Sequence, residues 1–330
     1  MIGSKLIKNY TYSVKAANWL RGGLKGLDVP KPIPVIRWSS KLTGGDTILK
    51  RRGAYIDLVI SDKVWCWGYG SLLWYLACGY YWYQQSGCSH AVGLHLMDGE
   101  HAHRSPLAFA SRSGDVVPIP DAHFFRQRGY INFRKASERS NLAWKERSDE
   151  IIWRGAPSGT GAIQLLGDDW ENPAVVHRIR LALRAKGSQI DFKFADRPSL
   201  QGRNLFLHAG VLGDPIPSES WAGRKFAIDI DGYVSAWSNL MSRLHQGCCV
   251  IKVESQFGYY QWYYDRLKPY EHYVPVKADL SNFFDQIEWA RSHQNECEEI
   301  ARNGQELARS MTLESETRVA GELMEEYGSV

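Results

Sequence analysis

The stretch from residue 225 to 277 constrains the fold of this chain more than any other. It opens with an apolar run at 226–230, short enough for a buried strand, which breaks at Asp231-Gly232, where glycine permits a turn. A polar loop leads to apolar residues at helical spacing within 240–244, and a second apolar run follows at 248–253. This order predicts a strand, a helix and a parallel strand, which is a βαβ unit of an α/β fold.

The start of the predicted helix is the first candidate for a ligand site. Ser235 or Ser238 can cap its first turn, and Gly247 can end the helix. Free N–H groups and the positive end of the helix dipole then lie at the carboxyl edge of the sheet, where they favour an anion. The pattern predicts a nucleotide diphosphate at this edge.

Several motifs lie in and around this stretch: Trp153-Arg154-Gly155, Asp229-Ile-Asp231-Gly232, Ser235-Ala-Trp237, the run 247–252, QWYYDRLKPYEHYVPV at 261–276 and DLSN at 279–282. Together they resemble one known family, glycosyltransferase family 90. The family includes protein O-glucosyl- and O-xylosyltransferases, fungal capsule xylosyltransferases and bacterial lipopolysaccharide glycosyltransferases. The resemblance covers roughly residues 94–311 and implies a GT-B-like α/β chain in which two Rossmann-like domains face a cleft.

The length of the chain also predicts more than one domain. A chain of 330 residues exceeds the usual size of a single hydrophobic core. A polar run at 145–150 precedes a strand that breaks into a Gly-rich loop, so we place a boundary there. We expect an N-terminal acceptor domain at 1–145, a C-terminal nucleotide-sugar donor domain at 146–305 and a helical tail at 306–330 that packs on the first domain.

The donor site is predicted from loop chemistry and from the family resemblance. The Gly-rich loop at 155–161 lacks the Gly-Lys-Ser/Thr of a P-loop but offers backbone N–H groups. The resemblance implies an arginine that Arg178 matches best, whereas Arg243 is the nearest arginine to the helix start and Glu254 can accept bonds from ribose hydroxyls. The predicted donor-binding residues are Arg154, Gly155, Ser158, Arg178, Asp231, Gly232, Ser235, Trp237, Ser238, Arg243 and Glu254.

The catalytic base is predicted in the first domain. Inverting transfer of a sugar needs a group that takes the proton of the acceptor hydroxyl, and the resemblance implies that Asp98 does so. Asp98 follows a predicted strand at 91–96, where a carboxylate can face a cleft. Asp121 also follows a strand and is an alternative for the same role.

Two other functions remain open. Asp229-Ile-Asp231 matches the Asp-x-Asp pair by which metal-dependent GT-A glycosyltransferases hold Mn²⁺. His95, Asp98, His101 and His103 form a second, unspecific metal pattern. The family resemblance favours a metal-independent enzyme with no cofactor besides its UDP-sugar donor. A protein that binds nucleotide sugars or carbohydrates without turnover is the other alternative, because Ala156 and Asn239 replace polar donor contacts of the family.

Charge and cysteine content limit the partners and the compartment. The net charge is only +4, too low to predict a nucleic-acid binder, although a basic N-terminal segment could meet an anionic membrane surface. The six cysteines form no C-x-x-C pair, which indicates free thiols in a reducing compartment, and no signal peptide is evident. We therefore expect a cytoplasmic enzyme, peripheral at the inner membrane, that transfers glucose or xylose to a lipopolysaccharide, capsule or lipid-linked glycan.

Overall fold

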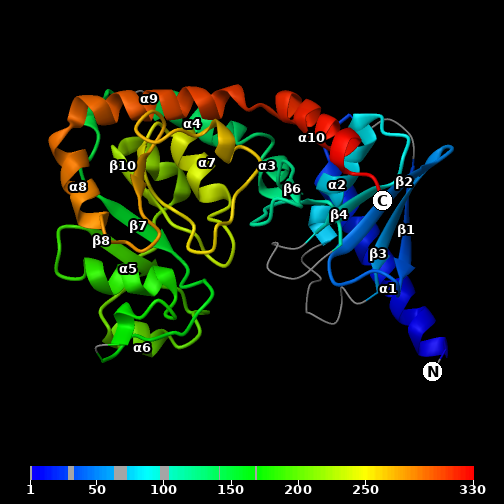
Figure 1. Cartoon of the computed structure of the whole chain (residues 1–330), viewed down its shortest axis with the longest axis horizontal. Helices are drawn as coiled ribbons and strands as arrows, with labels where there is room; N and C mark the ends of the chain where they lie inside the picture. Colours follow the sequence, from blue (N-terminus) through cyan, green and yellow to red (C-terminus); the bar gives the residue numbers. More distant parts are fainter. Residues whose placement is uncertain (1, 29–32, 63–72, 97–103, 141, 168) are drawn as a thin grey trace. The chain divides into compact units, whose positions relative to one another are not determined.

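The computed structural model describes residues 2–28, 33–62, 73–96, 104–140, 142–167 and 169–330 (Figure 1). The chain forms two compact units, each of which contains helices and a parallel sheet or a sheet with parallel pairs, so the predicted α/β class is confirmed. The first unit comprises 1–129, 260–263 and 312–330, and the second comprises 130–259 and 264–311. The limits expected at 145 and 305 both fall inside the second unit.

The first unit is built from a six-stranded sheet and helices. The strand order is β1-β3-β2-β4-β5-β6. β1 is parallel to β3, β4 is parallel to β5, and β5 is parallel to β6, whereas β2 runs antiparallel to β3 and β4. Its elements are α1 (Ile2–Leu24), β1 (Ile33–Ser39), β2 (Asp46–Arg52), β3 (Tyr55–Ser61), α2 (Leu73–Ser86), β4 (Val92–His95), β5 (Leu107–Ala108), β6 (Val117–Pro118), α3 (Ala122–Arg126) and α10 (Leu313–Tyr327).

Helix α2 lies at the centre of the helical layer of this unit. α1 and α10 both pack against it (Figure 1). The apolar stretch at 64–83 predicts either a buried helix or a surface that meets lipid or an acceptor. Trp82 and Tyr83 are fully buried, and Tyr80 is 1% exposed, so the described helix matches the first alternative. No helix in the described part of the chain is long and apolar enough to cross a membrane.

The second unit contains two three-stranded parallel sheets. One has the order β7-β8-β9, the other has the order β10-β11-β12, and β7 lies beside β10. Its elements are α4 (Ile131–Ser140), η3 (Trp144–Glu146), β7 (Ile152–Gly155), η4 (Asp169–Glu171), α5 (His177–Ala185), β8 (Asp191–Ala195), α6 (Arg203–His208), β9 (Leu212–Gly213), η5 (Ser218–Gly223), β10 (Phe226–Asp229), α7 (Ser238–His245), β11 (Cys249–Val253), η6 (Tyr264–Arg266), β12 (Val274–Val276), α8 (Phe283–Ser292) and α9 (Gln294–Ser310).

The predicted βαβ unit is confirmed in β10, α7 and β11. Phe226 pairs with Cys249 at the start of a parallel register, and the apolar face of α7 is buried. Gly247 has a φ of 70°, so it ends the helix in the left-handed conformation that glycine adopts at low cost. Helix α9 packs on α7 and β11, and it continues through Gly304, where an added Cβ would lie 2.8 Å from the carbonyl oxygen of His272. The small residue therefore permits close packing.

The described cysteines are free and buried, as the sequence predicts. They are Cys78, Cys88, Cys248, Cys249 and Cys297. Burial raises the pKa of Cys248 to about 11, so this thiol stays protonated at neutral pH.

Candidate functional site

The loop between β10 and α7 forms one side of the candidate donor site. β10 ends at Asp229, and α7 begins at Ser238. Between them, Trp237 has a φ of 49° and a ψ of −117°, a conformation that non-glycine residues rarely adopt. Trp237 is the residue before the helix and gives no side-chain cap, while Ser235 accepts the N–H of Trp237 at 3.3 Å. The predicted capping of α7 by Ser235 or Ser238 was therefore wrong.

Arg178, in the first turn of α5, connects this loop to the loop after β7. Its Nη1 donates to the carbonyl oxygen of Ala156 at 3.1 Å and to the hydroxyl of Ser158 at 2.8 Å. Its Nη2 donates to the carbonyl oxygen of Ile230 at 2.8 Å. The guanidinium carbon lies 5.3 Å from the centre of the Trp153 ring. One buried cation thus holds together two loops that follow neighbouring parallel strands.

Two predicted glycines leave room for these contacts. A Cβ added at Gly232 would lie 2.9 Å from the hydroxyl of Ser158 and 3.4 Å from Arg178. A Cβ added at Gly155 would lie 2.4 Å from the ring of Trp153. Any larger residue at either position would displace the side chains that surround the guanidinium group.

Asp231 brings a negative charge to the same place. Its side chain is buried, and neither carboxylate oxygen accepts a well-formed hydrogen bond from the described residues. Burial raises the pKa of Asp231 to about 6, although Lys252, Ser255 and Arg178 oppose the rise. A buried polar atom without a partner typically costs about 1–3 kcal/mol, so a ligand that donates hydrogen bonds here would recover free energy.

Burial also shifts the pKa of Arg178, but downward. It lowers the pKa of the guanidinium group to about 10, and the carboxylates of Asp231 and Asp229 counteract part of the change. Arg178 therefore remains positively charged at neutral pH. Its Nε–H is buried and has no acceptor among the described residues. Cation and carboxylate thus both have unused hydrogen-bonding capacity in one place.

Asp229, two residues before Asp231, is already paired. Its Oδ1 accepts from the amide of Asn239 at 2.8 Å, and its Oδ2 lies 3.6 Å from the ammonium group of Lys252. The same ammonium group lies 4.6 Å from the centre of the Tyr264 ring. Asp229 is fully buried, so these partners offset the cost of burying its charge. The arrangement favours a structural role for Asp229 over metal coordination.

Sequence reasoning missed Lys252 as a residue of the site. The available signal was Lys252 itself, because a lysine inside an otherwise apolar buried strand requires a buried acceptor. Asn239 was named from the family resemblance, but its hydrogen bond to Asp229 was not predicted.

Arg154 lies on β7, but its donors are used within the sheet. Nη2 forms an ion pair with Asp191 at 2.6 Å, and Nε donates to the carbonyl oxygen of Asp214 at 3.0 Å. Nη1 donates to the carbonyl oxygens of Trp153 and Asp191. Burial raises the pKa of Asp191, but hydrogen bonds and charge from Arg154 and Lys193 outweigh it and leave the pKa below its ordinary value. These contacts give Arg154 a structural role in joining β7 to β8.

Arg243 and Glu254 have surroundings unlike those of Arg178. Arg243 lies in the last turn of α7, donates to the carbonyl oxygen of Ser218 at 3.0 Å and lies over Trp221 at 3.7 Å from the ring centre. Burial lowers its pKa to about 10. Glu254 follows β11 with an exposed side chain. No hydrogen bond among the described residues links Arg243 to the group around Arg178.

The predicted base, Asp98, lies outside the described residues, as do His101 and His103. Its rival Asp121 is described, and its contacts define a helix cap. Oδ1 accepts the N–H of Phe124 at 2.8 Å, and Oδ2 accepts from the amide of Gln261. Asp121 is 1% exposed, so its carboxylate has little access to an acceptor hydroxyl.

Comparisons with known sequences find a family match in the C-terminal part of the chain. The family described as glycosyl transferase family 90 matches residues 209–330. This segment of the chain is therefore similar to glycosyltransferase family 90. The match includes the loop after β10, helix α7 and strand β11, so family 90 sequence forms one side of the candidate site, while Ser158 and Arg178 precede it.

Curated relatives include family enzymes and viral proteins. Protein O-glucosyltransferase 2 of Danio rerio is 29% identical over 171 residues, which are 51% of this chain and 30% of that protein. Protein O-glucosyltransferase 3 of Homo sapiens is 27% identical over 169 residues, 51% of this chain and 29% of that protein. Uncharacterized protein 035R of Invertebrate iridescent virus 3 is 42% identical over 179 residues, 51% of this chain and 15% of that protein. The matches thus cover less than a third of these relatives.

Two solved structures are distantly similar to this chain. One is Anabaena Alr3699/HepE in complex with UDP-glucose, with a TM-score of 0.36, 10% identity and coverage of 59% of this chain and 54% of that chain. The other is WaaG, a glycosyltransferase involved in lipopolysaccharide biosynthesis, with a TM-score of 0.34, 15% identity and coverage of 60% and 53%. The α/β assignment rests on the strands and helices described above.

Proposed function

We propose that this chain is an inverting glycosyltransferase that moves a sugar from a UDP-sugar to a hydroxyl group of a glycan. The observation that supports it is a buried cation, Arg178, near a buried carboxylate, Asp231, whose oxygens accept no well-formed hydrogen bond from the described residues. The match of residues 209–330 to glycosyltransferase family 90 supports the reaction class.

Each residue of the group has a role in holding the donor. The N–H groups at the start of α7 and the charge of Arg178 stabilise the diphosphate, whose negative charge increases as the bond to the sugar breaks. The carboxylate of Asp231 accepts hydrogen bonds from ribose or sugar hydroxyls, which supply the donors that its oxygens lack. Ser158 fixes the guanidinium group through its hydroxyl.

The transfer step needs one base and no cofactor. The oxygen of the acceptor hydroxyl attacks the anomeric carbon, the bond from that carbon to the diphosphate breaks, and UDP leaves with the electron pair. Asp98 takes the proton of the acceptor hydroxyl, so the charge balances without a metal ion. Glucose or xylose is the proposed sugar, and a lipopolysaccharide, capsule or lipid-linked glycan is the proposed acceptor. The enzyme would reach such an acceptor by peripheral contact with the membrane surface.

A panel of nucleotide sugars tests the proposal. Purified protein is heated with UDP-glucose, UDP-xylose, UDP-N-acetylglucosamine and GDP-mannose, and UDP release is measured in parallel. A bound donor at a hundredfold excess over its Kd stabilises the fold by about 2.7 kcal/mol, so the preferred UDP-sugar raises Tm and GDP-mannose does not.

Two outcomes contradict the proposal. Saturable binding without any UDP release, even in the presence of glycan acceptors, would identify a binding protein. No stabilisation by any UDP-sugar, or a stabilisation that Arg178→Met leaves unchanged, would remove the donor site from this edge of the sheet.

A further inference from the structure

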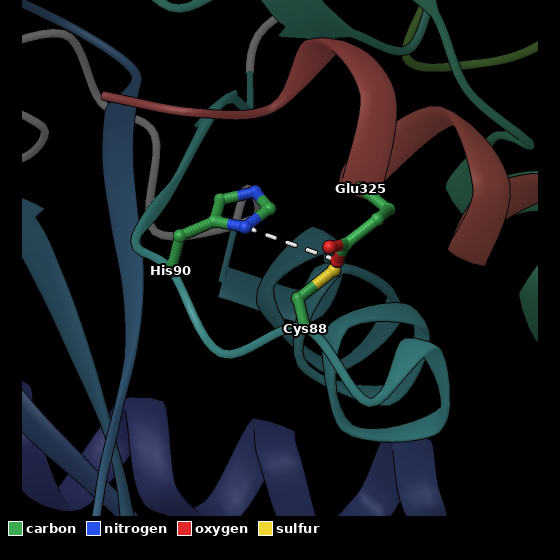
Figure 2. A group of neighbouring side chains, drawn as sticks. All are labelled: Cys88, His90 and Glu325. Atoms are coloured by element: carbon green, nitrogen blue, oxygen red, sulfur yellow. Dashed lines mark ion pairs between the residues drawn. The ribbon is translucent and has the colours of Figure 1, made fainter.

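Three side chains with metal-binding atoms meet in the first unit. Cys88 and His90 lie in the loop between α2 and β4, and Glu325 lies in the last turn of α10. The cysteine sulfur, a ring nitrogen of the histidine and a carboxylate oxygen all lie within 4.8 Å of one another. Figure 2 shows the three groups pointing toward a common point, with the Nδ1 of His90 3.8 Å from an oxygen of Glu325.

The loop that carries Cys88 and His90 is held in place by its backbone. Gly87 has a φ of 73°, which lets the chain turn directly after α2. The hydroxyl of Tyr83 donates to the carbonyl oxygen of His90 at 2.7 Å, and Nε of Arg51 donates to the carbonyl oxygen of Cys88 at 3.5 Å. The positions of the two side chains are therefore set before any ligand binds.

The helix that carries Glu325 is fixed against the same loop. Gly321 approaches the end of α2 so closely that an added Cβ would lie 3.3 Å from the Cα of Ser86. Beyond the helix, the N–H of Gly93 donates to the carbonyl oxygen of Gly328 at 2.9 Å, and the N–H of Val330 donates to that of Ala91 at 3.2 Å. The last residues of the chain thus pair with β4 beside the three side chains.

The hydrogen bond of His90 defines which ring nitrogen is available. Nε2 lies 3.2 Å from the carbonyl oxygen of Met324. A carbonyl oxygen only accepts, so Nε2 carries the hydrogen and the neutral ring keeps a lone pair on Nδ1, the atom that faces Glu325. A histidine that binds metal commonly donates its other ring N–H to a backbone carbonyl in this way.

We propose that Cys88, His90 and Glu325 bind a zinc ion. A thiolate, an imidazole and a carboxylate are ligands that Zn²⁺ accepts, whereas Mg²⁺ and Ca²⁺ prefer oxygen atoms alone. Tetrahedral zinc with bonds of about 2.0–2.3 Å places neighbouring ligand atoms about 3.3–3.6 Å apart, close to the observed 3.8 Å. Cys88 is buried and the side chain of Glu325 is 62% exposed, so water can complete the coordination from the solvent side.

Such an ion would act as a clamp within the first unit. It would link the loop after α2 to the last turn of α10. The ligands in these two segments are more than two hundred positions apart in the sequence. Zn²⁺ has no redox chemistry, and a metal that binds only the folded chain adds its binding free energy to stability. The ion would stabilise the fold and would take no part in the proposed sugar transfer.

Metal binding by the full chain tests the proposal directly. Protein treated with chelator is dialysed against Zn²⁺ and then analysed for bound metal, and Co²⁺ is added to a second sample to record thiolate-to-metal absorption. We expect one ion per chain, a higher Tm with Zn²⁺ and a thiolate band with Co²⁺. Cys88→Ser should weaken zinc binding by more than about 100-fold and abolish the band, because even partners behind the ligands change affinity by about 10- to 100-fold.

Matched variants separate the site from adventitious binding. His90→Ala and Glu325→Gln should also weaken binding, whereas Glu322→Gln, at an exposed position one helical turn earlier on α10, should not. Circular dichroism without metal verifies that each variant is folded. Wild-type protein that takes up no Zn²⁺, or Zn²⁺ uptake and a Co²⁺ thiolate band that persist in folded Cys88→Ser, would overturn the proposal.

Discussion

Asp121 in the first unit and Asp231 in the second are both buried carboxylates that follow a strand, yet their surroundings differ. Asp121 is 1% exposed, and each of its oxygens accepts a hydrogen bond, from the start of α3 and from Gln261. Asp231 is 6% exposed, and its oxygens lack well-formed hydrogen bonds from the described residues. A satisfied buried carboxylate maintains the fold, whereas an unsatisfied one destabilises it and is available to a ligand.

The largest expected effect separates Asp121 from the predicted base. Asp98→Asn should lower the rate of sugar transfer by about 10²- to 10⁴-fold and leave UDP-sugar affinity nearly unchanged, because the base acts on the acceptor hydroxyl. Asp121→Asn should reduce the rate far less. Turnover and donor binding are measured for both variants. An active Asp98→Asn beside an inactive Asp121→Asn that still binds donor would assign the role to Asp121.

A pH titration tests Asp231. Its folded pKa of about 6 lies above the ordinary value of 3.8, so its contribution to stability is complete below pH 3.8 and is lost as the pH rises through 6. The loss amounts to about 3 kcal/mol, at about 1.4 kcal/mol for each pKa unit. Relative to wild type, Asp231→Asn should therefore gain about 3 kcal/mol of unfolding free energy between pH 3 and pH 7.

Urea denaturation at several pH values measures this difference. Asp279→Asn is the matched control of opposite sign, because hydrogen bonds from Ser281 lower the pKa of Asp279 and its contribution is lost as the pH falls. If the unfolding free energies of wild type and Asp231→Asn change with pH in parallel, folding does not raise the pKa of Asp231. Asp231 would then not differ from Asp121 in the cost of its burial.

Substitution of Asp121 should lower stability, whereas Asp231→Asn should raise it at neutral pH. Asp121→Ala removes the cap of α3 and a buried partner of Gln261, so we expect a loss of about 2 kcal/mol at neutral pH. Donor affinity should not change. Denaturation curves and donor titration measure both. A donor affinity that falls along with stability would mean that Asp121 serves the site as well as the fold.

The smallest expected effect is that of a chelator on the reaction. EDTA should leave the rate of sugar transfer unchanged at temperatures well below Tm, because Asp229 is already paired with Asn239 and Lys252. It should lower Tm if the Cys88 site carries zinc. Loss of transfer in EDTA with recovery in Mn²⁺, and no recovery in Asp229→Asn, would restore the metal-dependent Asp-x-Asp hypothesis.

Local patterns made much of the second unit predictable. The apolar runs around Asp231-Gly232 specify strand, turn, helix and strand because burial periodicity and glycine conformation act over a few residues. Arg178 could be named from the family resemblance, and the structure places it with Ser158 and next to the loop that begins at Ile230. The capping of α7 was mispredicted, because the backbone of Trp237 follows the tertiary packing and not the local preference of serine.

The sequence by itself determined the α/β class, the βαβ unit around α7 and the resemblance to glycosyltransferase family 90. Only the tertiary structure decided which of the carboxylates are satisfied, because Asp229, Asp231 and Asp121 look alike in the sequence and differ in partners from distant elements. Only the tertiary structure brought His90 to α10, since Nε2 of its ring is hydrogen-bonded to the carbonyl oxygen of Met324, 234 positions away. Hydrogen-bond satisfaction and ligand geometry depend on contacts between segments far apart in the chain, which no local pattern specifies.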